Sequence, residues 1–218
     1  MANENISELV FILDRSGSMR GLESDTVGGF NSLIDKQKTI DGKCFVTTVL
    51  FNHLCETLHD RVDLADVKPM TEDDFGVRGC TALLDALGGA IRHVEQIHRY
   101  ARPEDVPGRT CFVIMTDGLE NASRRFDSGT VKRMIEQKKE EAGWEFLFLA
   151  ANIDAVETAV RYGIDVDRAV EYLSDGEGTR LVYETVADTL CASRLGAIPK
   201  NWSKNIEADR KRRKKNGK

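Results

Sequence analysis

Short uninterrupted runs of apolar residues recur along the chain and predict the strands of a buried sheet. None of these runs alternates apolar with polar positions, and the four clearest are Val10–Leu13, Phe112–Met115, Phe146–Ala150 and Ala169–Leu173. A strand that is apolar on both faces is typical of a parallel sheet covered by helices on both sides. These runs therefore predict the central strands of an α/β domain.

The segments between these runs have the spacing of helices. In each, apolar residues three or four positions apart predict one buried face. The faces are Val27, Phe30 and Ile34, then Leu83, Leu87, Ile91 and Val94, then Val131, Met134 and Ile135. A last helix is expected from Glu177 to Leu195, with Gly196 as its stop.

Two further segments, Cys44–Phe51 and Glu56–Leu64, are separated by too few residues for a helical crossover. We expect them to form an antiparallel hairpin. Strands that alternate with helices otherwise indicate parallel pairing. The predicted fold class is thus α/β, with a doubly wound, mostly parallel central sheet, one antiparallel edge strand and helices on both faces.

Oxygen-bearing side chains follow the predicted central strands or precede a predicted helix. Ligands of doubly wound sheets bind at the carboxyl ends of the strands, so these side chains are expected at one edge. They are Asp14, Ser16, Ser18, Thr81 and Asp117. Taken singly, each has a plainer interpretation as a helix cap or a turn residue. Their occurrence together predicts a binding site.

A set of oxygen ligands suits a hard cation, Mg²⁺ (or Mn²⁺), rather than zinc. Two carboxylates balance the charge of the cation, and three hydroxyls bind it weakly. Mg²⁺ takes six ligands, so a position is left for a carboxylate from outside. The candidate metal residues are therefore expected to create a binding site for an acidic group.

In pattern and order, these residues resemble the metal ion-dependent adhesion site (MIDAS) of the von Willebrand factor A (VWA) family. That site has Asp-x-Ser-x-Ser, here Asp14 to Ser18, followed by a distant Thr and a distant Asp, here Thr81 and Asp117. The resemblance covers roughly residues 6 to 195 and implies a Rossmann-like fold. It also implies that the serines and the threonine contact the metal, that the aspartates act through water, and that an acidic residue of a partner protein completes the shell.

The function expected from this resemblance is non-catalytic protein binding, with no catalytic residues. We considered Arg15, Met19, Arg20, Cys80, Leu119 and Glu120 as the rim of the binding surface. A metal-dependent hydrolase of phosphoesters or acyl groups is the alternative, although no general base can be named. Ser16-Gly17-Ser18 lacks the flanking glycines of a nucleophile elbow, and no phosphate-binding loop motif occurs.

Charge divides the chain into an acidic body and a basic end. Residues 197–218 hold nine basic and two acidic side chains, so they carry +7 and leave −12 on residues 1–196 out of a formal net charge of −5. We expect a VWA domain over 1–196 and a flexible basic tail over 197–218. The tail also suggests a nucleic-acid-associated protein, which we rank below protein binding, or an intramolecular partner for the acidic body.

The five cysteines are scattered and form no Cys-x-x-Cys pair, which favours reduced thiols and an intracellular setting. The first residues lack the pattern of an export signal, and no apolar run approaches the roughly 20 residues that span a bilayer. We therefore expect a cytoplasmic protein without a membrane span, whose partner is a protein that presents an Asp or Glu.

Overall fold

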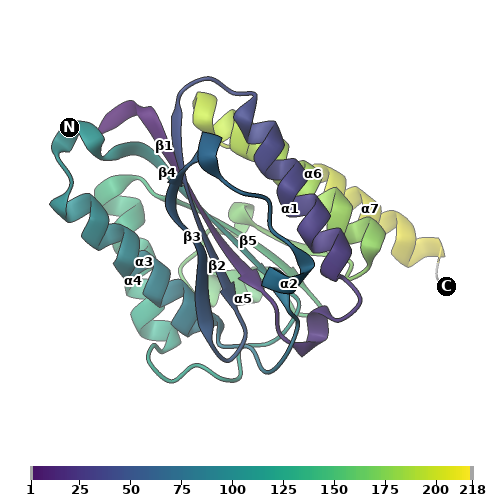
Figure 1. The fold of residues 1–218 in the computed structure, drawn as a ribbon. Coiled ribbons are helices and arrows are strands. Elements are labelled where there is room, and N and C mark those ends of the chain that lie inside the picture. Colours follow the sequence, from purple (N-terminus) through teal and green to yellow (C-terminus); the bar gives the residue numbers. More distant parts are fainter. Residues whose placement is uncertain (1, 217–218) are drawn as a thin grey trace.

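The computed structural model describes residues 2–216, which form one six-stranded sheet with helices on both faces (Figure 1). The strands are β1 (Asn3–Asp14), β2 (Lys43–Phe51), β3 (Cys55–Asp63), β4 (Pro107–Thr116), β5 (Glu145–Ala151) and β6 (Ala169–Tyr172). The helices are α1 (Glu23–Lys38), α2 (Glu72–Phe75), α3 (Leu83–Tyr100), α4 (Ser128–Ala142), α5 (Ala155–Arg161), α6 (Gly176–Leu195) and α7 (Lys204–Asn216).

The strand order is β3-β2-β1-β4-β5-β6, and every neighbouring pair except β2–β3 is parallel. The predicted fold class is confirmed, including the single antiparallel edge strand. β1 and β4 lie at the centre of the sheet. The connection after β1 leads to β2 on one side of β1, whereas the connection after β3 leads to β4 on its other side. This is the switch in strand order at which a doubly wound sheet binds its ligands.

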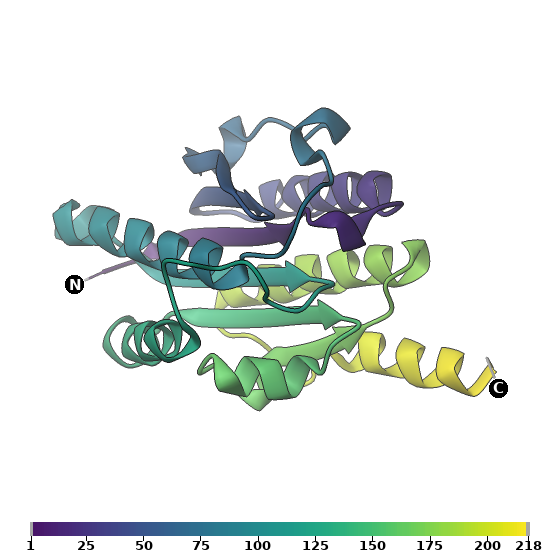
Figure 2. The same ribbon diagram turned by 90° about the horizontal axis from the view of Figure 1, so that it is seen from below.

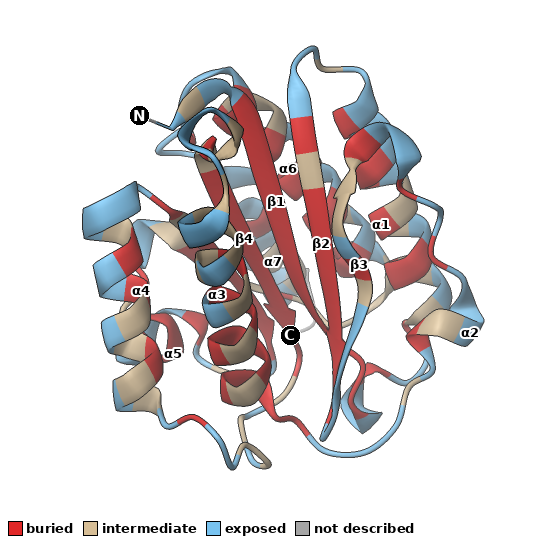
Figure 3. Cartoon of the chain, turned by 60° about the vertical axis from the view of Figure 1, so that its left-hand side comes forward, coloured by how far each residue is buried: buried red, intermediate tan, exposed pale blue. Residues whose placement is uncertain are grey.

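Side chains of β1 alternate between two cores. Leu9, Phe11 and Leu13 pack on the face that α1, α6 and α7 cover, while Val10 and Ile12 pack on the face of α3, α4 and α5. Figure 3 shows that β1, β2 and β4 are buried along most of their length, that the edge strand β3 is mostly not buried, and that the helices are buried only on their inner sides. The apolar runs do not alternate with polar residues because both faces of the sheet are covered by helices.

Helix boundaries follow local capping. Asp175 precedes α6 and accepts a hydrogen bond from the Gly178 amide, and Gly196 follows Leu195 as the stop that the sequence predicts. Asp127 caps α4 in the same way, and Gly143 ends it with a φ of 62°. Caps of this kind satisfy backbone groups that a helix end leaves unpaired. Within residues 2–216, no helix is long and apolar enough to cross a lipid bilayer.

The segment after residue 196 differs from the expected flexible tail. Residues 204–216 form helix α7, and the side chains of Ile198, Trp202 and Ile206 are buried in the core beneath α6. The Trp202 indole donates a hydrogen bond to the Asp167 carbonyl at 2.7 Å. The physical reason is that Ile198 and Trp202, which precede α7, and Ile206, in its first turn, bury apolar side chains that a solvated tail would leave exposed. Residues 217–218 of the expected tail lie outside the described residues.

The basic side chains of α7 pair with the acidic body of the domain. Arg213 forms ion pairs with Asp175 and Glu177 beside the start of α6, and Arg210 pairs with Glu171 in β6. Figure 2 shows α7 running along the sheet edge formed by β6, toward the end at which the strands finish. Of the alternatives that the sequence leaves open for this segment, the arrangement matches an intramolecular partner for the acidic body.

Candidate metal site

The turn after β1 carries three of the five candidate side chains. Asp14 ends the strand and is 1% exposed, and its Oδ1 accepts a hydrogen bond from the Ser16 amide at 2.7 Å. A short 3-10 helix (η1, Gly17–Met19) follows and turns the chain sharply. As a result, the Ser16 and Ser18 hydroxyl oxygens lie 3.0 Å apart. The Asp-x-Ser-x-Ser spacing thus gathers three oxygen-bearing groups within five residues.

Thr81 reaches this turn through a backbone contact between two loops. The Gly17 amide donates a hydrogen bond to the Gly79 carbonyl at 3.0 Å. Gly79 has a φ of 77°, and a Cβ at this position would collide with the His53 ring. A glycine is therefore required for the close approach of the two loops. Thr81 follows two residues later and is 3% exposed.

Asp117 follows the central strand β4 and is 2% exposed. Its Oδ1 accepts a hydrogen bond from the Ser18 hydroxyl, and its Oδ2 has no hydrogen-bond partner within the described part of the chain. A Cβ built on Gly118 would lie 3.2 Å from Thr81 Oγ1 and 3.3 Å from Ser18 Oγ. The hydroxyls of Thr81 and Ser18 therefore face a common point beside Asp117, and the structure brings all five candidate side chains together.

Burial raises the pKa of both carboxyl groups at this site. For Asp14, desolvation outweighs the hydrogen bonds from Thr116 and Ser16, which lower its pKa. For Asp117, desolvation likewise outweighs the hydrogen bond from the Ser18 hydroxyl, which lowers its pKa. Two buried carboxylates with few charge partners favour either protons or a cation.

The donor set fits a hard cation. Three hydroxyl oxygens and two carboxylates meet at the carboxyl ends of β1 and β4, and one carboxylate oxygen there is buried with no partner among the described residues. Within residues 2–216, no group of three or more His, Cys, Asp or Glu side chains could hold a metal ion, and the candidate site has only two carboxylates beside its hydroxyls. Oxygen-only ligands of this kind match Mg²⁺ or Mn²⁺ better than a soft metal.

Three residues that we expected at the rim support the site from within instead. Arg15 and Met19 are 4% and 5% exposed, and the Arg15 guanidinium binds the Asp74 carbonyl and Glu56. Glu120 accepts hydrogen bonds from the Leu84 amide at the start of α3 and from its own loop. These contacts depend on partners distant in sequence, so the sequence could not reveal them. Arg20, Cys80 and Leu119 are exposed as expected.

Three further polar side chains support the site, and the sequence did not predict their roles. The buried Thr116 hydroxyl donates to Asp14 Oδ2 at 2.6 Å. Asn121 holds Thr81 through two hydrogen bonds, one from its backbone amide and one to its side-chain oxygen. Asn152, at a φ of 58°, donates to the Asp117 carbonyl. The position of Thr116 directly before Asp117 is the one signal that the sequence offered.

Comparison with solved structures identifies the architecture. A structure of proximal thread matrix protein 1 from the mussel byssus, described as having a zinc-occupied MIDAS motif, matches 88% of this chain at 15% identity with a TM-score of 0.61. A von Willebrand factor type A protein from Catenulispora acidiphila matches 86% at 14% identity with a TM-score of 0.55. The ArnB paralog VWA2 from Sulfolobus acidocaldarius matches 87% at 18% identity with a TM-score of 0.51.

The chain spans less than half of each of these proteins, namely 47%, 42% and 46% of their lengths. No family model matches the sequence, and no curated protein matches it. Identities of this size establish the fold alone. The strand order, the antiparallel edge strand and the helices on both faces agree with that likeness. The chain has the fold of the von Willebrand factor A domains.

Proposed function

We propose that this protein is a non-catalytic binding module that holds one divalent cation, Mg²⁺ or Mn²⁺, between Asp14, Ser16, Ser18, Thr81 and Asp117. The observation that carries the proposal is the buried, unpartnered Oδ2 of Asp117 beside three hydroxyl oxygens from two loops. A buried carboxylate oxygen without a partner is costly, and a cation would satisfy it. The zinc-occupied MIDAS described for the mussel protein supports metal binding at this type of site.

The bound cation would act as an electrophile toward an Asp or Glu of a partner protein. Ser16, Ser18 and Thr81 would offer neutral oxygens to it, so that it keeps its affinity for a further carboxylate. Thr116 and the Ser16 amide hold Asp14 in place, and Ser18 holds Asp117. Rigid support of this kind keeps the ligand oxygens at metal-binding positions.

Titration calorimetry with Mg²⁺ tests the proposal. We expect the wild-type protein to bind one cation, and we expect the Ser16→Ala/Ser18→Ala variant to bind at least about 100-fold more weakly, since outer-shell changes alone cost 10- to 100-fold. The matched control is Ser24→Ala/Ser32→Ala, which removes two exposed hydroxyls from α1. Equal Mg²⁺ affinity in the wild type and the Ser16/Ser18 variant would refute the assignment.

We also propose that the protein binds its partner without catalysing a reaction. His53, whose ring lies against Gly79, is the histidine that a hydrolase at this edge would use as a base. A panel of chromogenic esters and phosphates with Mg²⁺ or Mn²⁺ is expected to show no turnover. Turnover lost in a His53→Ala variant would establish the hydrolase instead.

We further propose a reducing, cytoplasmic location. All five cysteines are free, and burial raises the pKa of Cys44 to about 12 and that of Cys111 further still, so both remain protonated thiols. Fractionation of the native cells tests the location.

A further inference from the structure

Each of the three loops that meet at the candidate metal site carries an exposed arginine. Arg20 lies two residues after Ser18, and Arg78 directly precedes Gly79. Arg124 lies in the loop that leads from Asp117 to α4. We call these three residues the arginine rim. Three cations at one edge stand out in a domain whose residues 1–196 carry −12.

Backbone hydrogen bonds fix the positions of the arginine rim beside the site. The Arg78 amide donates to the Arg15 carbonyl at 3.0 Å, within the turn that holds Ser16. The Arg124 amide donates to an Asp85 carboxylate oxygen at 3.0 Å, in the first turn of the helix that follows Thr81. The arginines are thus anchored to the same loops as the candidate metal ligands.

The guanidinium groups of the arginine rim have no ion-pair or hydrogen-bond partner among the residues that the structure describes. Among residues 2–216, no carboxylate lies within ion-pairing distance of any of the three, whereas Arg15, Arg168 and Arg213 all form ion pairs. Two carboxylates at this edge are engaged by other groups. Glu56 pairs with Arg15, and the oxygens of Asp85 accept hydrogen bonds from three backbone amides.

Two exposed leucines lie at the same edge. Leu54 is 58% exposed in the turn between β2 and β3, whose Asn52 carbonyl accepts a hydrogen bond from Ala82 beside Thr81. Leu119 is 64% exposed and lies two residues after Asp117. Figure 3 shows the loops that follow β1 and β2 at the end of the sheet opposite to the N-terminus, largely exposed on their outer side. Exposed apolar side chains beside unpaired cations are typical of a contact surface.

We infer that this edge binds an acidic protein segment, in which the Asp or Glu that reaches the cation is flanked by further acidic residues that contact the arginine rim. The inference rests on the proposed function and extends it to the chemistry of the partner. The charge of −12 on residues 1–196 disfavours such a segment over much of the domain, so the arginine rim directs it to the metal edge. Leu54 and Leu119 would contact apolar side chains between the acidic positions.

Two fluorescent nine-residue peptides test the inference by anisotropy. One has a single central Glu among neutral residues, and the other has the same Glu flanked by four more. In Mg²⁺, we expect the wild type to bind the acidic peptide at least about tenfold more tightly, since each exposed ion pair contributes a few-fold. The Arg20→Ala/Arg78→Ala/Arg124→Ala variant is expected to lose this preference and to keep the Mg²⁺ affinity and melting temperature of the wild type.

The matched control is Lys43→Ala/Arg99→Ala/Lys200→Ala, which removes the same charge from the opposite end of the sheet, where β2 begins and α3 and α6 end. It is expected to keep the preference within twofold. Equal binding of the two peptides by the wild type in Mg²⁺ would refute the role of the arginine rim in binding acidic residues. It would leave the proposed metal site intact. Unchanged binding of the acidic peptide in EDTA would instead contradict the proposed function alone. A single-stranded oligonucleotide that outcompetes the acidic peptide at this edge would also overturn the inference.

Discussion

Thr116 links the two central strands at the scale of single side chains. Its hydroxyl donates to Asp14 Oδ2 at 2.6 Å and accepts a hydrogen bond from the Gly118 amide at 3.3 Å. One buried hydroxyl therefore orients the carboxylate that follows β1 and the turn that carries Asp117. A partner 102 positions away in the sequence made this role invisible before the fold was known.

We expect Thr116→Val to weaken Mg²⁺ binding about 10- to 100-fold, because Asp14 loses the donor that orients it. The free energy of unfolding is expected to fall by about 1–3 kcal/mol, since the Gly118 amide also loses its acceptor. Calorimetry and urea denaturation measure the two effects.

Thr110→Val is the matched control on the same strand. The Thr110 hydroxyl is buried without a hydrogen-bond partner within residues 2–216, so its replacement by a methyl group is expected to be neutral or stabilising. If Thr110→Val weakened Mg²⁺ binding as much as Thr116→Val, the role of Thr116 in orienting Asp14 would be refuted.

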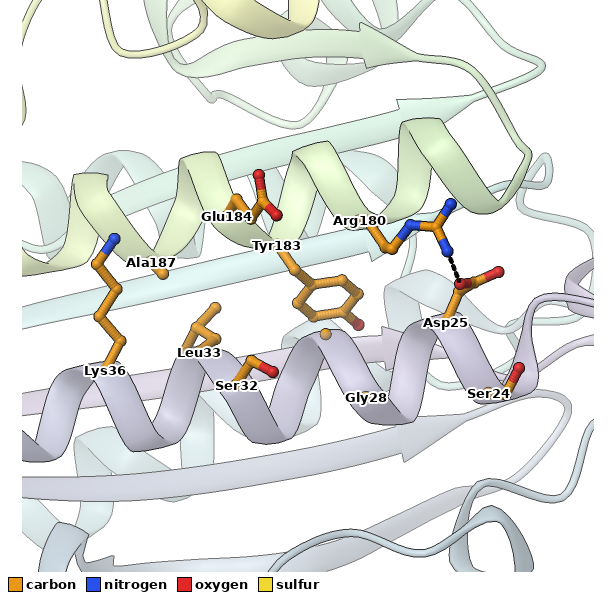
Figure 4. A pocket seen from close by; sticks show the side chains of 11 residues that line it. Ser24, Asp25, Gly28, Ser32, Leu33, Lys36, Arg180, Tyr183, Glu184 and Ala187 are labelled. Carbon is orange, nitrogen blue, oxygen red and sulfur yellow. Dashed lines mark hydrogen bonds and ion pairs between the residues drawn. The ribbon is translucent and has the colours of Figure 1, made fainter.

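The packing of α1 against α6 illustrates the scale of elements. Figure 4 shows the Tyr183 ring projecting from α6 toward α1, with the Asp25–Arg180 ion pair beside it. The ring lies over Gly29, where a Cβ would approach Tyr183 Cδ2 to 2.5 Å. A surface groove of about 290 Å³ borders this contact. The close approach of the two helices depends on the missing side chain at Gly29.

Two neighbouring glycines of α1 should therefore respond in opposite directions. Gly29→Ala is expected to lower the free energy of unfolding by about 1–3 kcal/mol through overpacking against Tyr183. Gly28→Ala is expected to raise it by about 0.4–1 kcal/mol, because a Cβ there meets nothing within 4 Å and alanine favours a helix. Urea denaturation of both variants measures the two changes, and an equal effect of the two would contradict the close contact between Tyr183 and Gly29.

At the scale of the whole molecule, the basic C-terminal segment belongs to the domain. Trp202 and Ile206 are 6% and 2% exposed, and Arg213 pairs with Asp175 at the cap of α6. Basic side chains that are paired within the molecule are less free to contact a polyanion. The pairing of these side chains within the molecule therefore argues against nucleic-acid binding driven by the C-terminal segment.

We expect Trp202→Ala to lower the free energy of unfolding by about 3–5 kcal/mol, as for other large aromatic side chains in a core. Lys211→Ala, on the exposed side of α7, which follows Trp202, should change it by less than about 0.5 kcal/mol. Thermal and urea unfolding compare the two variants. A Trp202→Ala protein as stable as the wild type would show that the segment between α6 and α7 does not contribute to the core.

The sequence alone predicted the elements whose signal is local. Val10–Leu13 and Phe112–Met115 are apolar without alternation because both faces of the sheet are covered, and that pattern needs no knowledge of partners. The meeting of the five candidate residues at one edge was predictable for a related reason. Each follows a strand or precedes a helix, so the topology alone brings them to one edge.

Only the tertiary structure decided which polar side chains have partners. Arg15 and Glu120 turned inward because Glu56 and the start of α3 lie beside them, and Arg20, Arg78 and Arg124 stayed exposed without such partners. The docking of α7 was decided in the same way. Local periodicity reports which face of an element is apolar, but the contacts of a charged group depend on residues that folding brings from far along the chain.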